Sequence, residues 1–408
     1  MADFFQPAEV VTLPHLAAPP PPDAALQARL RSAGAALLLP AHADECGRPA
    51  FENILRQSAA VPWLTHRIIC MNGLPEQRLP EVRADLAQRL SGSAAQAILL
   101  RPEAHELQPL WRAVSAEGRS GGASVEFGKG ANIWLATAWL LAQGGGGWVI
   151  SHDCDLVNPP PDLLWRLCLP LVHPEIGLRW VKASYARVAA GRLYGRMTRL
   201  LVLPLLRAVT DVLGPTPATE RLSAFRYPLA GEFASRLEDL GQLRIAPGWG
   251  LEIAMLGEVS RRLPPDALGQ VDLGFHYDHR HRPTEGETAG DGLALPAREV
   301  ARAILREVLR DAEPRAAEAL SALLVTRYAV RAEEWRQRYR RVSLANGLDP
   351  ADAEELACVR CFSAALTEVA AGHDLGPARD LPPPAEWLAA HPEQAELLRQ
   401  IRPLTPPT

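Results

Sequence analysis

The sequence has 408 residues, a length that predicts two domains or one large domain with an extension, and its hydrophobic fraction of 48% suffices for a large buried core. Its formal net charge of −4 gives no basis for binding nucleic acid or an acidic membrane surface. It contains no run of about 18 apolar residues, so we expect no membrane-spanning segment.

The cysteines indicate a reducing environment. Six are present without the spacing of a disulfide framework, and no secretory signal is visible, so we expect a cytoplasmic protein. Cys358 and Cys361 share one face of a predicted helix. Because no second pair follows, they fit buried helix residues better than a zinc or redox site.

The N-terminal half predicts an extended arm followed by alternating strands and helices. Residues 1–30, which include the prolines Pro19 to Pro22, are typical of an extended arm. Short apolar runs then predict strands at 35–40, 66–71, 97–100 and 148–155. A helical pattern at 131–141 precedes the last of these strands. Strands that alternate with helices at this spacing favour a parallel, doubly wound α/β sheet.

The carboxyl ends of these strands are the expected ligand-binding edge, as in other open α/β sheets. Pro40, Asn72 and Asp153 each stand at such an end. Asp153 and Asp155 are separated by one residue, so they point the same way if strand geometry persists. Two carboxylates there suit Mg²⁺ or Mn²⁺ carrying a diphosphate. The alternative is a loop that carries two solvated acids.

Three further segments carry candidate binding groups. Lys129 is flanked by glycines that let the backbone approach a phosphate, although Walker spacing is absent and a solvated loop lysine is the alternative. The loop 191–199 combines Gly, Arg and Thr before an apolar helix, which favours anion binding over a merely basic surface loop. Glu252 lies inside an apolar strip, where a carboxylate is rarely placed for solvation.

A histidine-rich segment and a helical region complete the chain. His276, His279 and His281 follow a predicted strand end at 270–274, and one of them could join the two aspartates around a divalent ion. From residue 295 the sequence becomes rich in Ala, Arg and Glu with helical apolar spacing. The predicted helical windows are 297–312, 315–341 and 351–371, and a Pro-rich tail follows residue 381.

The order of these segments resembles the glucosyl-3-phosphoglycerate synthases, which are retaining glycosyltransferases of the GT-A fold. The resemblance is strongest to the longer archaeal and bacterial branch with a C-terminal helical extension, and it covers about residues 1 to 370. The shared stretches are GKGANIW (128–134), HDCDLVNP (152–159), KASYARV (182–188), YGRMTRLLVLPLLRAV (194–209), FRYPLAGEF (225–233), GWGLEI (248–253) and QVDLG followed by YDHRH (270–281).

The resemblance implies an α/β fold with a GT-A, mostly parallel, doubly wound nucleotide-sugar domain. The expected division is an N-terminal arm at 1–30 and a glycosyltransferase domain at 31–290, which consists of a nucleotide-sugar half (31–160) and an acceptor half (161–290). A helical extension at 295–380 and a Pro-rich tail at 381–408 follow. The extension would cover part of the core or form an oligomer interface.

The resemblance also implies a role for each candidate residue. The metal ligands would be Asp153, Asp155 and His279, and the catalytic residues Asp155, Glu252 and Lys129. The nucleotide-sugar site would consist of Pro40, Ala41, Asp44, Glu45, Asn72, Lys129, Asp153, Tyr227, Leu229 and Gly231. The acceptor-binding loop would consist of Gly195, Arg196, Met197 and Thr198, with Arg196 and Thr198 holding a phosphate.

The implied reaction is a hexosyl transfer that retains anomeric configuration. Glucose would pass from UDP- or GDP-glucose to the 2-hydroxyl of D-3-phosphoglycerate, with Mg²⁺ or Mn²⁺, for the synthesis of the compatible solute glucosylglycerate. The enzyme would be a cytoplasmic homodimer. Alternatives are GDP-mannose as donor, glycerate as acceptor, or a sugar-phosphate nucleotidyltransferase. The last would need a Gly- and Arg-rich loop after the first strand, where this chain has Pro40-Ala41-His42.

Three positions depart from the family pattern. Asn72 stands where relatives are expected to have aspartate, which leaves the choice between uracil and guanine open, because an amide offers a different donor and acceptor pattern. His42 replaces the expected apolar or hydroxyl residue. The insertion of Tyr277 and Asp278 leaves either His276 or His279 as the metal ligand, and we favour His279.

Overall fold

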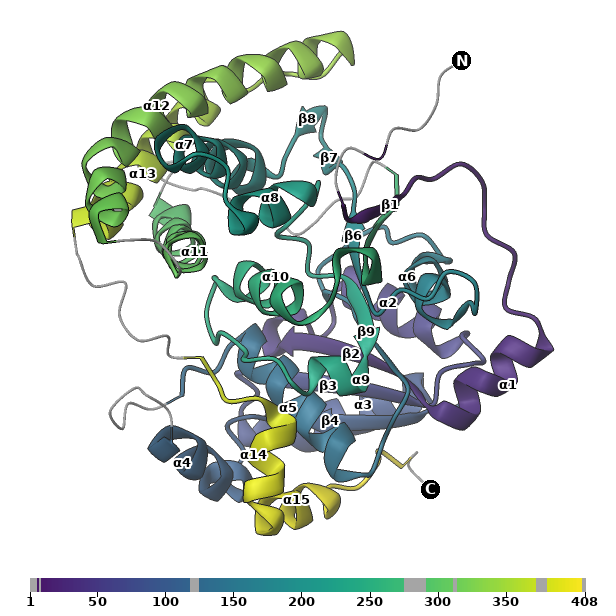
Figure 1. Ribbon diagram of the computed structural model, residues 1–408. Coiled ribbons are helices and arrows are strands. Elements are labelled where there is room, and N and C mark those ends of the chain that lie inside the picture. Colours follow the sequence, from purple (N-terminus) through teal and green to yellow (C-terminus); the bar gives the residue numbers. More distant parts are fainter. Residues whose placement is uncertain are drawn as a thin grey trace.

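The structure is a computed structural model that describes residues 6, 9–117, 125–274, 291–310, 314–371 and 380–405. Figure 1 shows a twisted central sheet with helices on both faces and a group of long helices at one end of the molecule. This arrangement confirms the predicted α/β architecture with a helical extension.

The central sheet of the described residues has eight strands, and all but one of them run parallel. In spatial order they are β1 (Val11–Leu13), β10 (Leu268–Asp272), β6 (Trp180–Ser184), β9 (Phe233–Arg236), β5 (Trp148–Ser151), β2 (Ala35–His42), β3 (His66–Asn72) and β4 (Gln96–Leu100). The strands predicted near 35, 66, 97 and 148 are therefore confirmed. The antiparallel strand β9 was not predicted, and it pairs with β5 on one side and β6 on the other.

The central strands read as continuous apolar runs because both faces of the sheet are covered. Along β2, Ala36 and Leu38 enter one hydrophobic cluster, whereas Leu37 and Leu39 enter the other. The first cluster contains the apolar side of α5 (Lys129–Ala142). This helix starts two residues before the predicted helix at 131–141. The second contains residues of α2 (Pro49–Ala59), α3 (Leu79–Arg89) and α6 (Leu163–Val172).

The N-terminal segment is more ordered than an extended arm. Val11–Leu13 forms the edge strand β1 beside β10, and α1 covers Ala24–Ala33. The Asp23 side chain accepts a hydrogen bond of 2.8 Å from the Leu26 amide, which caps that helix. The expectation of an extended arm over 1–30 is therefore wrong for these two segments, since the arm reading rested on the intervening prolines alone.

The C-terminal tail also forms helices, α14 (Pro384–Ala390) and α15 (Pro392–Arg399), which lie beside α5 (Figure 1). Each begins with proline, which fits the first turn because the missing amide has no partner there in any case. The Trp134 indole donates to the Pro382 carbonyl at 2.7 Å, and Trp387 is 2% exposed. The tail therefore seals the apolar outer face of α5.

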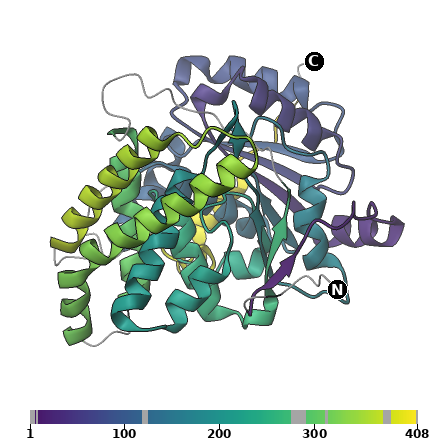
Figure 2. The same cartoon turned by 90° about the horizontal axis from the view of Figure 1, so that it is seen from above.

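The three predicted helical windows are confirmed as α11 (Asp291–Leu309), α12 (Pro314–Ala345) and α13 (Asp352–Ala371). Figure 2 shows α12 and α13 lying along the outside of the molecule. α12 packs on α7 (Leu203–Leu213), and both helices pack on the π-helical segment Met197–Val202 before it. The Tyr328 hydroxyl of α12 donates to the Leu200 carbonyl at 2.7 Å. The boundaries between domains remain a prediction, because this helical layer shares one hydrophobic cluster with the sheet.

No helix among the described residues is long and apolar enough to cross a membrane.

The glycine run before β5 fixes where that strand begins. Gly147 has φ of 84°, and a Cβ there would lie 1.9 Å from the Gly34 carbonyl oxygen. Gly144 has φ of 71°, but a Cβ there would meet nothing within 4 Å. The Trp148 amide donates to Gly34 at 2.9 Å, so close approach of the two backbones is part of the sheet.

We expect Gly147→Ala to destabilise the protein by about 1–3 kcal/mol more than Gly144→Ala, because both carry the left-handed strain but only the first adds overpacking. Urea unfolding of the two variants measures the difference. Equal losses of unfolding free energy would show that the contact between Gly147 and Gly34 does not constrain β5.

Candidate active site

The two aspartates lie beyond the strand that leads to them. β5 ends at Ser151, and Asp153 and Asp155 lie in the turn that follows. The strand geometry on which the alternation argument depended therefore does not persist to these residues, and their shared direction stays a prediction. Their neighbours His152 and Cys154 are buried, at 3% and 4% exposure.

Lys129 joins two of the predicted site acids. Its Nζ lies 2.6 Å from Asp153 Oδ1 and 3.0 Å from Glu252 Oε1. Lys129 is the first residue of α5, and Glu252 lies in the first turn of α10 (Leu251–Arg262). Burial by itself lowers the pKa of Lys129, but Asp153 and Glu252 outweigh it and hold this pKa well above its usual value. The lysine therefore stays protonated at neutral pH.

Gly231 lies against this ion-paired group. A Cβ at Gly231 would lie 2.1 Å from Asp153 Oδ2 and 2.2 Å from Lys129 Nζ, so a larger residue would require these two side chains to move. The turn that carries Gly231 is anchored by Lys182 of β6, whose Nζ donates to the Ala230 carbonyl at 2.5 Å. The predicted donor-lining stretch is thus brought to the predicted metal-binding acid.

The other two predicted donor-lining residues lie on the same turn. Tyr227 makes an edge-to-face contact with Tyr185, with ring centroids 5.0 Å apart, and burial raises the pKa of Tyr227 to about 12. Arg187 hydrogen-bonds Tyr227 and is attracted electrostatically by Asp155. Leu229 is partly buried and packs against the first hydrophobic cluster.

The sequence reasoning gave no role to the polar residues beneath this turn, Lys182, Tyr185, Arg187 and Glu232. Glu232 is fully buried and accepts a 2.8 Å hydrogen bond from the Tyr185 hydroxyl. Burial lowers the pKa of Lys182 to about 8, although Glu252 opposes the shift. A lysine inside a buried strand was the available signal, since charged side chains are almost never fully buried without a partner.

The predicted nucleotide-binding residues gather at the ends of β2 and β3. Asn132 of α5 donates to the Ala41 carbonyl and to Asn72 Oδ1, both at 3.2 Å, and Asn72 Nδ2 donates to the Phe127 carbonyl at 3.2 Å. Pro40 and Ala41 are the third-last and second-last residues of β2. Asp44 and Glu45 follow in a short 3₁₀ turn, the first exposed and the second 8% exposed.

The predicted acceptor loop lies against the helical extension. Arg196 is 3.5 Å from Glu354 of α13, and its guanidinium lies 5.9 Å from the centre of the Tyr194 ring. Thr198 is 6% exposed, and its hydroxyl is buried without a hydrogen-bond partner in the protein. Gly195 has φ of 76°, which allows the sharp turn between Tyr194 and Arg196. Met197 begins the π-helical segment.

The predicted metal ligands lie only partly within the described residues. His276 and His279 lie outside them, and within them no cluster of three ligand-type side chains occurs. Asp153 and Asp155 nevertheless fit such an ion in their chemistry, because carboxylates are the hard oxygen donors that Mg²⁺ and Mn²⁺ prefer. The choice of histidine remains a prediction.

The comparisons with known proteins agree with this geometry. No family model matches the chain. The glucosyl-3-phosphoglycerate synthase of Persephonella marina is 30% identical over 368 residues, which are 90% of this chain and 89% of the relative. The chain belongs to the glucosyl-3-phosphoglycerate synthase family. The resemblance stated from the sequence is therefore confirmed.

Solved structures of the family share the fold. The synthase of Mycobacterium tuberculosis in complex with Mn²⁺, UDP-glucose and phosphoglyceric acid matches with a TM-score of 0.52 and 28% identity, over 74% of this chain and 88% of that one. A complex of the same relative with Mg²⁺ and UDP has a TM-score of 0.51 at 28% identity, over 73% and 86% of the two chains. Its complex with Mn²⁺, UDP and glucosyl-3-phosphoglycerate has a TM-score of 0.50 at 27% identity, over 73% and 87%. The predicted GT-A fold is thereby confirmed.

The buried Lys182 gives the stability of the protein a characteristic pH dependence. Its folded pKa, about 8, lies below its ordinary value of 10.5, so the unfolded chain binds more protons between these values. The unfolding free energy of the natural protein should therefore rise relative to Lys182→Met by up to about 3 kcal/mol between pH 7 and pH 10. Urea unfolding of both proteins across this range measures the difference, in which other titrating groups cancel. A flat or falling difference would contradict the lowered pKa.

Proposed function

We propose that the chain transfers glucose from UDP- or GDP-glucose to the 2-hydroxyl of D-3-phosphoglycerate and retains the anomeric configuration. The observation that carries this proposal is the contact of Lys129 with both Asp153 and Glu252, against which Gly231 lies. It gathers the family's donor-binding stretches in one place. The complexes of the M. tuberculosis relative with UDP-glucose and with the glucosylated product support the same donor, acceptor and direction.

The donor side is arranged to stabilise the charge that develops on a leaving diphosphate. Asp153 and Asp155, with His279 as the expected third ligand, would hold Mg²⁺ or Mn²⁺, which supplies Lewis-acid neutralisation of the phosphates when it is bound. Lys129 remains protonated and adds a second positive charge at the same place. Electrostatic stabilisation of this kind is usually the largest single contribution to catalysis.

The carboxylates of this region favour front-face attack over a covalent intermediate. Glu252 is paired with Lys129, and Glu232 is fully buried and bound to the Tyr185 hydroxyl. Neither is therefore free to act as a nucleophile on the sugar. Glu252 would instead orient hydroxyl groups of the sugar or the acceptor, and the leaving oxygen would accept the proton of the attacking hydroxyl.

The acceptor would be held by its phosphate on the loop 195–198. Arg196 supplies a cation, and the unpartnered Thr198 hydroxyl supplies a hydrogen bond. Holding the phosphate fixes the 2-hydroxyl relative to the donor, which removes part of the entropic barrier.

The remaining expectations concern setting and assembly. All six cysteines lie in the described residues and none forms a disulfide, which supports a reducing compartment such as the cytoplasm. A homodimer stays a prediction; Leu323 and Val330 of α12, 48% and 52% exposed and on one helix face, offer apolar surface for it. The product would serve glucosylglycerate synthesis.

A matrix of donors and acceptors tests the proposed reaction. UDP-glucose, GDP-glucose and GDP-mannose are each combined with 3-phosphoglycerate and with glycerate in the presence of Mg²⁺ or Mn²⁺, and products are identified by mass spectrometry. We expect glucosyl-3-phosphoglycerate from at least one glucose donor and little product from glycerate, which lacks the group that Arg196 binds. Mannosyl product, preference for glycerate, or only sugar-nucleotide synthesis would replace the proposal by the corresponding alternative.

We expect Asp155→Ala to lower kcat at least about 100-fold in metal-saturated assays, because the leaving diphosphate loses its stabilisation. Asp162→Ala is the control, since Asp162 lies away from the site acids and pairs with Arg166 at a distance of 2.7 Å. The control should retain the kcat of the natural protein. Full activity of Asp155→Ala would refute the metal site.

A further inference from the structure

The start of α13 is tied to the acceptor loop by a ladder of contacts. The Asp349 amide donates to the Gly191 carbonyl at 2.9 Å, and the Asp349 carboxylate lies 2.9 Å from the Arg192 guanidinium. Glu354 then contacts Arg192 at 2.6 Å and Arg196 at 3.5 Å. Ion pairs and a backbone hydrogen bond therefore join the proposed phosphate-binding loop to the helical extension.

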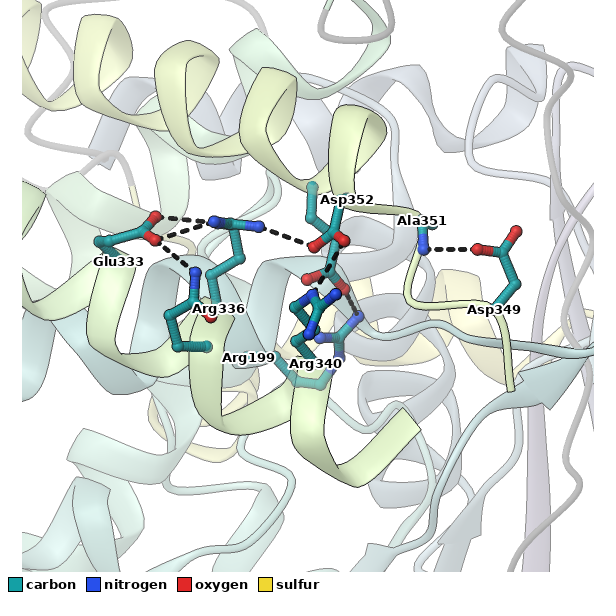
Figure 3. A network of polar contacts seen from close by, with 9 residues as sticks. Arg199, Glu333, Arg336, Arg340, Asp349, Ala351 and Asp352 are labelled. Atoms are coloured by element: carbon teal, nitrogen blue, oxygen red, sulfur yellow. Dashed lines mark hydrogen bonds and ion pairs between the residues drawn. The ribbon is translucent and has the colours of Figure 1, made fainter. Parts of the chain in front are cut away.

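A second layer of ion pairs fixes the position of this segment. Figure 3 shows the Asp349 side chain accepting from the Ala351 amide, and Asp352 lying between Arg336 and Arg340 of α12. The bonds measure 2.9 Å for Ala351, 2.8 Å for Arg336 and 3.0 Å for Arg340. In the first turn of α13, Asp352 therefore pairs with α12, whereas Glu354 and Glu355 pair with arginines of the loop and of the segment that follows it.

The two glutamates differ in how easily their contacts can be broken. Glu355 pairs with Arg199 at 2.7 Å, and both side chains are about 5% exposed, at 5% and 6%. Removing a partner from such a buried pair leaves an uncompensated charge, so this pair is permanent. Glu354 is 44% exposed and lies farther from Arg196 than from Arg192. Its contact with Arg196, which is 22% exposed, is a single ion pair of 3.5 Å, and a stronger anion can displace it.

In the protein without ligand, Arg196 thus contacts a carboxylate, which is negatively charged like the phosphate that the loop is proposed to bind. A phosphate carries more charge and more acceptor oxygens than a carboxylate, so it competes successfully for the guanidinium. When it does, Glu354 retains its shorter contact with Arg192 and is not left without a counterion.

We propose that Glu354 is a resident counterion of the acceptor site, which occupies Arg196 until the phosphate of the acceptor displaces it and which thereby sets the affinity for the acceptor. The inference rests on the proposed function and assigns a role at the acceptor site to the C-terminal helical extension. Glu354 acts through Arg196 and is a positioning residue.

The test is the KM for 3-phosphoglycerate of Glu354→Gln, measured at saturating donor and metal. We expect KM to fall roughly two- to fivefold with little change in kcat, because the competing charge is gone while the side-chain length is kept. Inorganic phosphate, used as a competitive inhibitor, should bind more tightly by a similar factor. Glu354→Asp, which keeps the charge but withdraws it, should lie between the two proteins.

Two further variants separate this role from a structural one. In the Arg196→Ala background, the substitution Glu354→Gln should no longer change KM, since the shared partner is absent. Glu333→Gln removes the same charge from α12, where Glu333 pairs with Arg336 at 2.8 Å, and should leave KM and kcat unchanged. An unchanged or raised KM in Glu354→Gln, or the same fall in Glu333→Gln, would overturn the inference.

Calorimetric titration with inorganic phosphate distinguishes failure of the inference from failure of the proposed function. If the natural protein transfers no glucose to 3-phosphoglycerate but Glu354→Gln binds phosphate more tightly, the reaction is wrong and the counterion role stands. If transfer occurs and phosphate affinity does not change, the reaction stands and the counterion role is wrong.

Discussion

The ammonium group of Lys129 is the point on which the arrangement of the site depends. It lies between the carboxylates of Asp153 and Glu252, which come from the turn after β5 and the first turn of α10. Without a cation there, two acids from different elements would repel each other in a partly buried space. The donor-lining turn approaches the same ion-paired group, because a Cβ at Gly231 would meet both Asp153 and Lys129. Elements from widely separated parts of the sequence are thereby held at one edge of the sheet.

Much of this edge could be predicted from the sequence, though not always for the right reason. The parallel strands near 35, 66, 97 and 148 follow from their continuous apolar runs, and the grouping of Lys129, Asp153, Gly231 and Glu252 follows from the family's motif order. Asp153 lies in a turn, so strand periodicity does not explain its direction. The helices in the tail are not evident from its Pro-rich composition, although proline is a common first residue of a helix.

The contacts that escaped prediction are between residues distant in the sequence. Nothing in the local pattern pairs Lys182 with the Ala230 carbonyl or Tyr185 with Glu232, because these depend on β9 inserting between β5 and β6. Phe233–Arg236 is too short, and too ordinary in composition, to reveal itself as a central strand. Likewise, the helical windows near the C-terminus predicted helices but could not show that α13 touches the loop at 191–199.

The direction of β9 has a consequence for how the site can move. All of its sheet neighbours finish at the ligand-binding edge, whereas β9 starts there, directly after Gly231 and Glu232. The segment beside Asp153, called the wall here, is Gly231 and Glu232, and it leads directly into a strand that is hydrogen-bonded on both sides. The Ala183 amide extends this pairing by donating to the Glu232 carbonyl at 3.0 Å. Such a wall has no hinge of its own. Any opening that admits a substrate must come from the segments that face it, and the wall serves as the fixed reference against which they close.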